Sequence, residues 1–230
     1  NANIPATIEM IGRENLPAGY VEKVDSFKVG IPVFVLYAGV NGDFRAPFGD
    51  AREIIVQDEW DPDWFVGAIE ACNPEESILY ITNYSTFDPT AAPAGRNVIT
   101  ITGSLGDACW NDWNWNDYEQ FKVLKDEIAL RTMARVEKVV PGITKAIEVL
   151  DVAAPQTLRA FTLNPRGTIF GYDETVEQSI LNRIEQSTPI PNVYLAGAWT
   201  FPGPGQETVL SSGLLAAQAI LKADAAARTR

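Results

Sequence analysis

NVYLAGAWTFPGPGQETVLSSGLLAAQAIL, residues 192–221, is the stretch around which the rest of the sequence is best interpreted. Its first part, Val193–Ala196, is a short apolar run rich in strand-forming residues, which predicts a buried strand. Its last part, Gln206–Ala223, carries apolar residues at spacings of three and four, which predicts a helix. Between the two, regular structure is broken by Gly197, Pro202, Gly203, Pro204 and Gly205.

A strand, a glycine-rich crossing and a helix in this order point the N-terminus of the helix at whatever lies over the end of the strand. The unpaired N–H groups and partial positive charge of a helix N-terminus suit an anionic or electron-rich ligand. Units of this kind are also common in α/β proteins that bind nothing there. The pattern alone therefore leaves both interpretations open.

The segment TPIPNVYLAGAWTFPGPGQETVLSSGLLAA resembles the C-terminal flavin-binding signature of the phytoene desaturase, carotenoid isomerase and retinol saturase group, within the flavin amine oxidase superfamily. The resemblance continues upstream through NPRGTIFGYDETVEQSILNR, residues 164–183. More weakly it reaches NANIPATIEMIG at the N-terminus, which resembles the middle of such a chain. It covers essentially the whole sequence, and its motifs are long.

The resemblance implies a fold between α/β and α+β. We expect residues 1–175 to form a mixed-sheet substrate domain with cap helices, and residues 176–230 to be the C-terminal strand-helix piece of a Rossmann-like FAD-binding domain. Members of the group begin with a G-x-G-x-x-G turn for the FAD pyrophosphate. Neither GVNGDF at Gly39 nor GSLGDA at Gly103 has that spacing. We expect a C-terminal fragment that lacks the N-terminal dinucleotide-binding half and is colourless and inactive in isolation.

The resemblance also implies which residues form the site, while it leaves the catalytic residues unknown. The segment 164–171 would lie near the flavin, with Arg166, Phe170 and Tyr172 at the substrate. The residues expected to contact FAD are Gly197, Ala198, Trp199, Gly205, Gln206, Glu207, Thr208 and Val209.

Two of these positions depart from the pattern of many flavoproteins. Ala198 stands where an acidic residue often binds ribityl hydroxyls, although some bacterial desaturases resemble this chain there. Glu207 stands where many relatives have a small or apolar residue, and a carboxylate near reduced flavin would oppose its negative charge. Glu207 therefore argues against a simple desaturase role.

Composition excludes several classes of function. The formal net charge of −12 argues against nucleic acid as a partner, because binding it requires Lys and Arg to neutralise phosphates. The sequence has no histidine, which excludes His-ligated metal sites and Ser-His-Asp chemistry, and we expect no metal. Cys72 and Cys109 are expected to be buried thiols in a reducing compartment, with a disulfide between them as the minor alternative. No signal peptide or membrane span is evident, so we expect a cytoplasmic protein, with peripheral membrane contact left open.

Local patterns predict the elements upstream of the signature. Strands are expected at residues 4–11, 28–40, 53–57, 77–83, 97–102 and 157–162, and helices at residues 17–27, 61–71, 117–140, 143–150 and 174–182. The long helix 117–140 and the shorter helix 143–150 would form a hairpin packed on the sheet. CWNDWNWNDY, residues 109–118, is interpreted either as the rim of an apolar channel or as a loop whose aromatic side chains hold the next helix.

Three functions remain open. The first is an FAD-dependent oxidoreductase that desaturates, saturates or isomerises an apolar polyene or isoprenoid. The second is an amine oxidase-like flavoenzyme, which an aromatic cage would favour. The third is a non-catalytic substrate-binding or interaction module.

Overall fold

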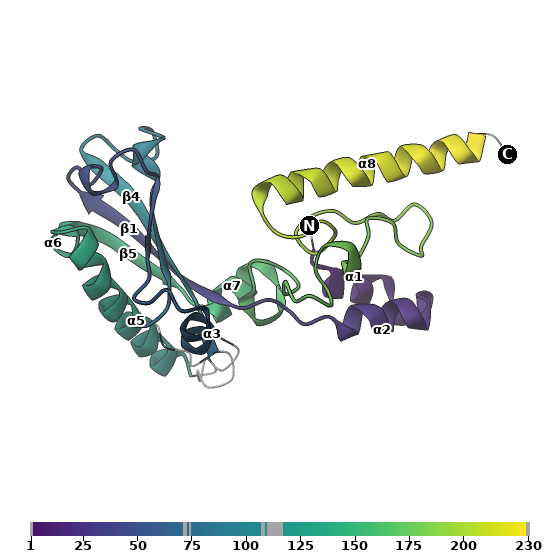
Figure 1. Cartoon of the computed structure of the whole chain (residues 1–230), viewed down its shortest axis with the longest axis horizontal. Coiled ribbons are helices and arrows are strands. Elements are labelled where there is room, and N and C mark those ends of the chain that lie inside the picture. The colour runs from purple at the N-terminus through teal and green to yellow at the C-terminus, as the bar shows by residue number, and fades with distance from the viewer. Residues whose placement is uncertain (1, 71–72, 74, 107–108, 110–116, 229–230) are drawn as a thin grey trace. The chain divides into compact units, whose positions relative to one another are not determined.

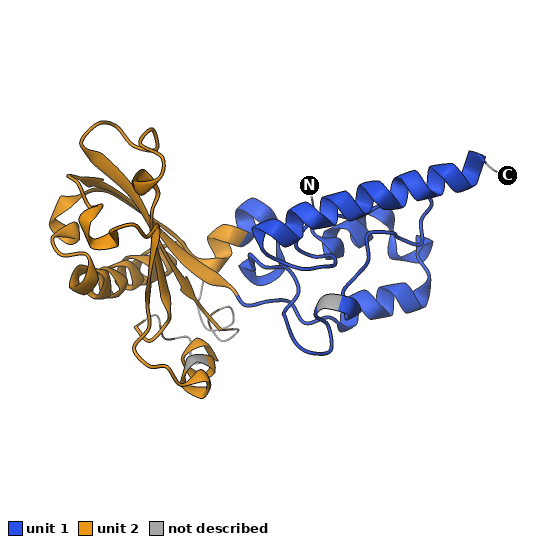
Figure 2. Ribbon diagram, turned by 45° about the horizontal axis from the view of Figure 1, so that its top comes forward, with its two compact units in different colours: residues 1–31, 159–230 blue, residues 32–158 orange. Residues whose placement is uncertain are grey.

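The protein is described from a computed structural model, which defines residues 2–70, 73, 75–106, 109 and 117–228. The chain divides into two compact units (Figure 2). Unit 1 combines residues 1–31 with residues 159–230, and unit 2 consists of residues 32–158. Residue 175, where we expected the substrate domain to end, falls inside unit 1.

Unit 2 is built on a five-stranded sheet of order β2-β3-β4-β1-β5 (Figure 1). Every pairing in it is antiparallel, so the expectation of a mixed sheet is wrong. The strands β2, β3 and β4 confirm three predicted strands to within a few residues. The strand β1 confirms a fourth but begins five residues later than predicted. The bounds are β1 Val33–Asn41, β2 Glu53–Val56, β3 Leu79–Asn83, β4 Arg96–Ser104 and β5 Ile147–Ala153.

One face of this sheet carries the core of unit 2, because alternate residues of the central strands are apolar and point to that side. Phe34 and Leu36 of β1 are fully buried there, as is Ile101 of β4. The helix α5, Tyr118–Val139, packs on the same face through Ile128, Met133 and Val136 (Figure 1). Its start is as predicted, since the Asp117 side chain accepts a hydrogen bond from the Gln120 N–H at 3.1 Å.

The opposite face of the sheet is less covered. The cross-strand pairs Tyr37–Thr100 and Tyr80–Thr102 lie on it, and Tyr37 is 43% exposed. Tyr80, Thr100 and Thr102 are half-buried. We call this surface, made by Tyr37, Tyr80, Thr100 and Thr102, the open sheet face.

The prediction of a helix at residues 143–150, the second of the hairpin, is wrong. Residues 143–150 form a single turn, α6 Ile143–Ala146, and then enter β5. Glu137 at the end of α5 fixes this turn, because its carboxylate accepts hydrogen bonds from the N–H groups of Gly142 at 2.6 Å and Thr144 at 3.0 Å. A hydrogen bond from the Thr144 hydroxyl is the largest cause of the lowered pKa of Glu137.

Helix α3, Pro62–Glu70, confirms the helix predicted at residues 61–71, and Pro62 is its first residue, a position that suits proline. Cys109 is buried in the core of unit 2 and forms a disulfide, so the expectation of a free thiol is wrong for it. The other cysteine, Cys72, and most of the tryptophan-rich stretch, residues 110–116, lie outside the described residues.

Unit 1 contains mainly helices and turns. Helix α2, Ala18–Ser26, agrees with the prediction for residues 17–27. The strand predicted at residues 4–11 is instead helix α1, Ile4–Ile11, with the Asn3 side chain at its N-cap and Pro5 in its first turn. The strand predicted at residues 157–162 is instead helix α7, Pro155–Thr162, which begins at the end of unit 2.

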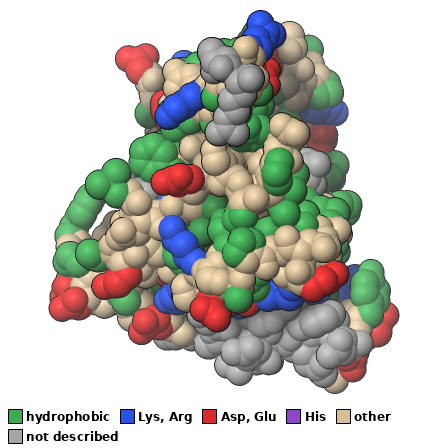
Figure 3. All heavy atoms as spheres, turned by 90° about the vertical axis from the view of Figure 1, so that its right-hand side faces the viewer, with side chains coloured by type: hydrophobic (Ala, Val, Ile, Leu, Met, Phe, Trp, Pro, Cys, Tyr) green, Lys and Arg blue, Asp and Glu red, His purple; other side chains and the backbone are tan. Residues whose placement is uncertain are grey.

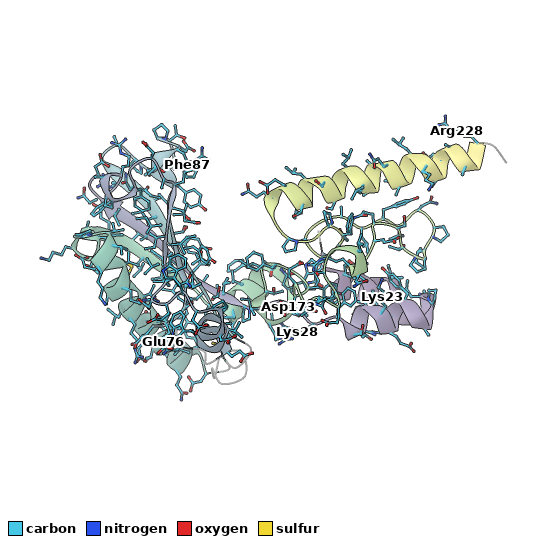
Figure 4. All side chains as sticks on the ribbon, in the orientation of Figure 1. Lys23, Lys28, Glu76, Phe87, Asp173 and Arg228 are labelled. Carbon is cyan, nitrogen blue, oxygen red and sulfur yellow. The ribbon has the colours of Figure 1, made fainter. Side chains whose placement is uncertain are left out.

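Short turns replace the helix that we predicted at residues 174–182. Only Ile180–Asn182 forms a 3₁₀ turn there. The core of unit 1 brings the two ends of the chain together, since Ile4, Ile8 and Val24 pack with Tyr172 and Trp199. Figure 4 labels one surface contact between the same two stretches, where the Lys28 ammonium lies 3.3 Å from the Asp173 carboxylate.

Candidate functional site

The signature segment is partly as predicted. Its helix is present as α8, Gln206–Arg228, the longest helix described. Its strand is absent, because Val193–Ala196 makes no ladder and only an isolated bridge joins Tyr194 to Ser187. Val193, Tyr194 and Leu195 are half-buried, in contrast to the buried strand that we expected.

Gly197 lies directly against α8. Its N–H donates a hydrogen bond of 2.7 Å to the hydroxyl of Ser212, which is fully buried on the second turn of the helix. The glycine and the amino-terminal end of α8 therefore belong to one compact feature. Because this N–H is already bound to Ser212, it is not a donor for a flavin. The α-carbon of Gly197, with φ of 115°, faces open space, since an added Cβ would have no neighbour within 4 Å.

The crossing between Gly197 and α8 is held by polar side chains. The Thr200 hydroxyl donates to the Gly197 carbonyl at 2.9 Å, and the buried Gln186 amide donates to the Phe201 carbonyl. Thr208 closes the start of α8 by donating to the carbonyls of Pro204 and Gly205. We call residues 197–205 the crossing loop.

Residues 164–171, the segment expected near the substrate, pack on the crossing loop. We call them the substrate segment. A Cβ added to Gly171 would lie 3.2 Å from the Ala198 carbonyl oxygen and 3.2 Å from the Trp199 ring, and only glycine allows this approach at φ of 81°. Residues 164–171 form turns, as expected, with a 3₁₀ turn at Pro165–Gly167. The structure thus brings together the two segments that the sequence marked separately as cofactor and substrate contacts.

The three predicted substrate residues are not equivalent in position. Phe170 is 44% exposed and Arg166 is half-buried, with left-handed backbone at φ of 54°. Tyr172 is 1% exposed and packs edge to face on Trp199, with ring centroids 4.8 Å apart. Burial raises the pKa of the Tyr172 hydroxyl, which has no hydrogen-bond partner within the described residues. This placement gives Tyr172 and Trp199 a packing role in unit 1, while Phe170 is free to meet a ligand.

Sequence reasoning did not single out Arg183, whose side chain is fully buried. One of its nitrogens, Nη2, donates to the carbonyls of Tyr172 at 2.9 Å and Ala198 at 3.0 Å. The Glu174 carboxylate lies 2.6 Å from Nη1. Burial lowers the pKa of Arg183, and Glu174 counteracts that effect. An arginine next to the apolar Ile184 in the stretch ILNRI was the available signal.

A small cavity of about 250 Å³ lies beside Arg183 within unit 1. Leu215 and Ala219 of α8 form its apolar wall, and Gln186 and Ser187 contribute polar groups. It is smaller than typical ligand pockets. In the described part of the chain no cluster of three or more acidic, histidine or cysteine residues could hold a metal.

Most of α8 is uncovered. Hydrophobic side chains reach the surface in several places on the face drawn in Figure 3. Along α8, only Ser212 and Ala216 are buried, whereas Leu210 is 76% exposed, Leu214 61% and Leu221 68%. At 100° per residue these three leucines and Ala217 lie on the side opposite Ser212. We call them the leucine face of α8.

Helix α8 also differs from the sequence prediction, in which no membrane span was evident. By length and composition alone it is long and apolar enough to cross a membrane, with a mean hydropathy of 1.2 over its best window. Only 11% of that window is buried. A helix with apolar residues on opposite sides is usually buried on both sides, by protein or by membrane.

The first turn of α8 holds the remaining predicted cofactor contacts. Gln206, Glu207 and Gly205 are exposed, and Val209 is 37% exposed. The Glu207 carboxylate lies in the first turn, where the helix dipole stabilises it. A ligand at this end would meet exposed backbone from a glycine-rich loop and one carboxylate.

The family model described as flavin containing amine oxidoreductase matches residues 44–221. The chain belongs to this family. A prolycopene isomerase of Arabidopsis thaliana chloroplasts is 25% identical over 86% of the chain and 32% of its own length.

Two bacterial relatives of this family member are desaturases. The phytoene desaturase (neurosporene-forming) of Rhodobacter capsulatus is 31% identical over 86% of the chain and 38% of its own length. A 4,4'-diapophytoene desaturase of Staphylococcus haemolyticus is 26% identical over 87% of the chain and 40% of its own length. The chain therefore spans between about a third and two fifths of the length of these curated relatives.

Proposed function

We propose that the chain is the C-terminal part of an FAD-dependent oxidoreductase that desaturates, saturates or isomerises an apolar polyene or isoprenoid. The observation that carries this proposal is the contact of Gly171 with Ala198 and Trp199, which joins the substrate segment to the crossing loop. The family match and the names of the relatives support the same function.

The crossing loop and the start of α8 fit a flavin in three respects. Gly197 presents an open α-carbon, Gly205 is exposed, and the first turn of α8 has a helix N-terminus that suits negative charge. Ala198 and the residues Gln206–Val209 are the further contacts that we propose. The flavin itself would supply hydride transfer, which this histidine-free chain does not provide through titrating side chains.

The residues of the chain would hold and orient the ring. Ser212 holds the N–H of Gly197 at the start of the crossing loop. Glu207 would lie near the anionic end of the reduced ring and disfavour its reduction, which opposes hydride acceptance from the substrate. Among the three polyene reactions, this carboxylate argues against desaturation and leaves saturation and isomerisation open.

The remainder of the FAD-binding domain would come from polypeptide outside this chain. Among the residues that the structure describes, the apolar run Val193–Ala196 has strand-forming residues without a ladder, and the leucine face of α8 is exposed. We propose that strands of a Rossmann-like dinucleotide-binding half pair with the former and pack on the latter. A peripheral contact of this face with a membrane is the competing proposal, and the cytoplasmic location stays a proposal with it.

The open sheet face of unit 2 is our proposed wall for the substrate. Tyr37 and Tyr80 offer flat apolar rings, and Thr100 and Thr102 add small side chains. A polyene is flat, extended and without charge, so it suits the two aromatic rings of this surface. Asp151 pairs with Tyr37 on the same face, so a carboxylate that could contact an amine lies beside the rings and keeps the amine oxidase alternative open.

A reduction assay tests the substrate class. The polypeptide read from its natural start codon is purified with FAD and mixed without oxygen with a hydrocarbon polyene or with a primary amine. We expect the polyene to be desaturated or isomerised, or saturated when the flavin is first reduced with dithionite, and the amine to leave oxidised flavin unchanged. Flavin bleaching by the amine, with the polyene unchanged, would establish the amine oxidase alternative. No turnover of either would favour the non-catalytic module.

A further inference from the structure

Arg183 connects three stretches of unit 1 that are otherwise separate turns. Its guanidinium donates to the carbonyls of Tyr172 and Asp173, after the substrate segment, and to the carbonyl of Ala198 in the crossing loop. Only a planar group with several N–H donors reaches three carbonyls from one position. The side chain thus sets the distance between the two halves of the candidate site.

The other end of the crossing loop rests on the same ion pair. A Cβ added to Gly203, whose φ is 127°, would lie 3.0 Å from the Glu174 carboxylate and 3.5 Å from Nε of Arg183. Glycine at this position lets the loop come down onto the charged groups. Ala198 and Gly203, on opposite sides of the loop, therefore both depend on Arg183 and Glu174.

Burying this charge is costly, so the fold must gain something specific from it. A guanidinium out of water needs a counter-ion and hydrogen bonds, and here it has one carboxylate and three carbonyls. Its Nε remains buried with no partner in the part of the chain that the structure describes. An apolar side chain of the same size would avoid these costs but would leave the three carbonyls without their donor.

From these contacts we propose that Arg183 is a positioning residue, which with Glu174 holds the crossing loop in the shape that receives the flavin. The inference rests on the proposed function for its ligand. Arg183 can hold the loop without any other polypeptide, because every contact named lies within unit 1.

Trp199 reports the position of the loop. It follows Ala198, is 9% exposed, and its ring meets that of Tyr172. The other five tryptophans of the sequence all lie between residues 60 and 115, in unit 2. With 5-fluorotryptophan in the 230-residue chain, the ¹⁹F resonance of Trp199 is assigned by its loss in Trp199→Phe.

Four variants test the contacts of Arg183 and Glu174 with the crossing loop, which we call the clamp. Arg183→Met removes the donors, Arg183→Lys keeps the charge without the planar fork, and Glu174→Gln keeps an acceptor without the charge. Arg13→Met is the control, because Arg13 is an exposed arginine of the same unit, paired with Glu9 and Asp25. We expect the three clamp variants to move or broaden the Trp199 resonance and to leave the unit 2 resonances unchanged, with no effect from Arg13→Met.

Flavin affinity then separates this inference from the proposed function. In the polypeptide read from its natural start codon, Arg183→Met and Arg183→Lys are expected to weaken FAD binding at least about tenfold, the loss that one misplaced loop produces. Unchanged Trp199 resonance and unchanged FAD affinity in both variants would overturn the role of Arg183. A wild-type protein that binds no FAD would overturn the proposed function instead, and the Trp199 resonance would still decide whether Arg183 holds the loop.

Discussion

Aspartate at both Leu210 and Leu214 is expected to prevent the chain from joining the rest of a flavin-binding domain, while the isolated chain keeps its fold. Both leucines belong to the leucine face of α8 and are mostly exposed in this chain. Full burial of a leucine contributes about 1.5–3 kcal/mol. Losing two such contacts weakens assembly about a hundredfold or more, at about 1.4 kcal/mol per factor of ten. Co-purification of the two halves with FAD measures this.

The same helix offers a matched control. Ser211 and Gln218 are exposed on its polar flank, so Ser211→Asp with Gln218→Asp adds the same charge beside the leucine face. The control pair is expected to assemble normally. Thermal melts of both isolated chains should stay close to wild type, because substitutions at exposed sites usually change stability by about 0.5 kcal/mol or less. Assembly unaffected by the leucine pair, or vesicle binding lost in its place, would show that the face meets something else.

Valine at Gly103 is expected to unfold unit 2. Gly103 lies in β4 opposite Phe34 of β1, and an added Cβ would lie 2.2 Å from two atoms of the Phe34 ring. The ring is fully buried in the core and has no space to move into. Overpacking usually costs about 1–3 kcal/mol, and a clash this close lies at or above the upper end. The loss of the cooperative denaturant transition of unit 2 measures it.

Gly39→Ala is the control for this substitution. Gly39 lies in β1 as well, but on the side of the open sheet face, where an added Cβ meets Val149 at an ordinary 3.5 Å. Alanine loses less backbone freedom on folding than glycine does, so the change is expected to be neutral or slightly stabilising. Equal damage from Gly39→Ala and Gly103→Val would mean that the sheet tolerates no change at all, and the packing argument would fail.

The elements that sequence alone predicted well are those whose signals are local. Asp117 before α5, Pro62 at the start of α3 and the long apolar period of α8 each specify a helix without help from the rest of the chain. The errors have a different cause. In residues 4–11 the apolar positions 4, 8 and 11 have helical spacing, and Asn3 and Pro5 mark a helix start that an alternating interpretation overlooks.

Two further errors depend on pairing with distant residues. Residues 147–153 became a strand because β1 offers them a free edge, through pairs such as Leu36 with Val152. Val193–Ala196 shows the opposite case, since a strand needs a neighbour and no described segment supplies a ladder. Short apolar runs are ambiguous between helix and strand, and tertiary contacts decide which one forms.

The two segments of the candidate site lie together, but the residues that support them were not predicted. Gly171 packs on Ala198, while the flavin and substrate contacts assigned to these segments stay predictions. Arg183 and Ser212 lie within the two stretches that carry the resemblance, and Gln186 lies between them, but nothing in their residue types marked any of the three as holding the loop. Their roles arise from hydrogen bonds to backbone carbonyls and N–H groups, whose positions are visible only in three dimensions.

The central claim is that residues 192–221 form half of a flavin cradle and that polypeptide outside this chain completes it. The most direct measurement is the amount of FAD retained after gel filtration, for the 230-residue chain, for the separately produced upstream polypeptide, and for the two mixed. We predict a colourless 230-residue chain and a mixture that retains one FAD per pair. Stoichiometric FAD on the 230-residue chain alone, or none on the mixture, would contradict the claim.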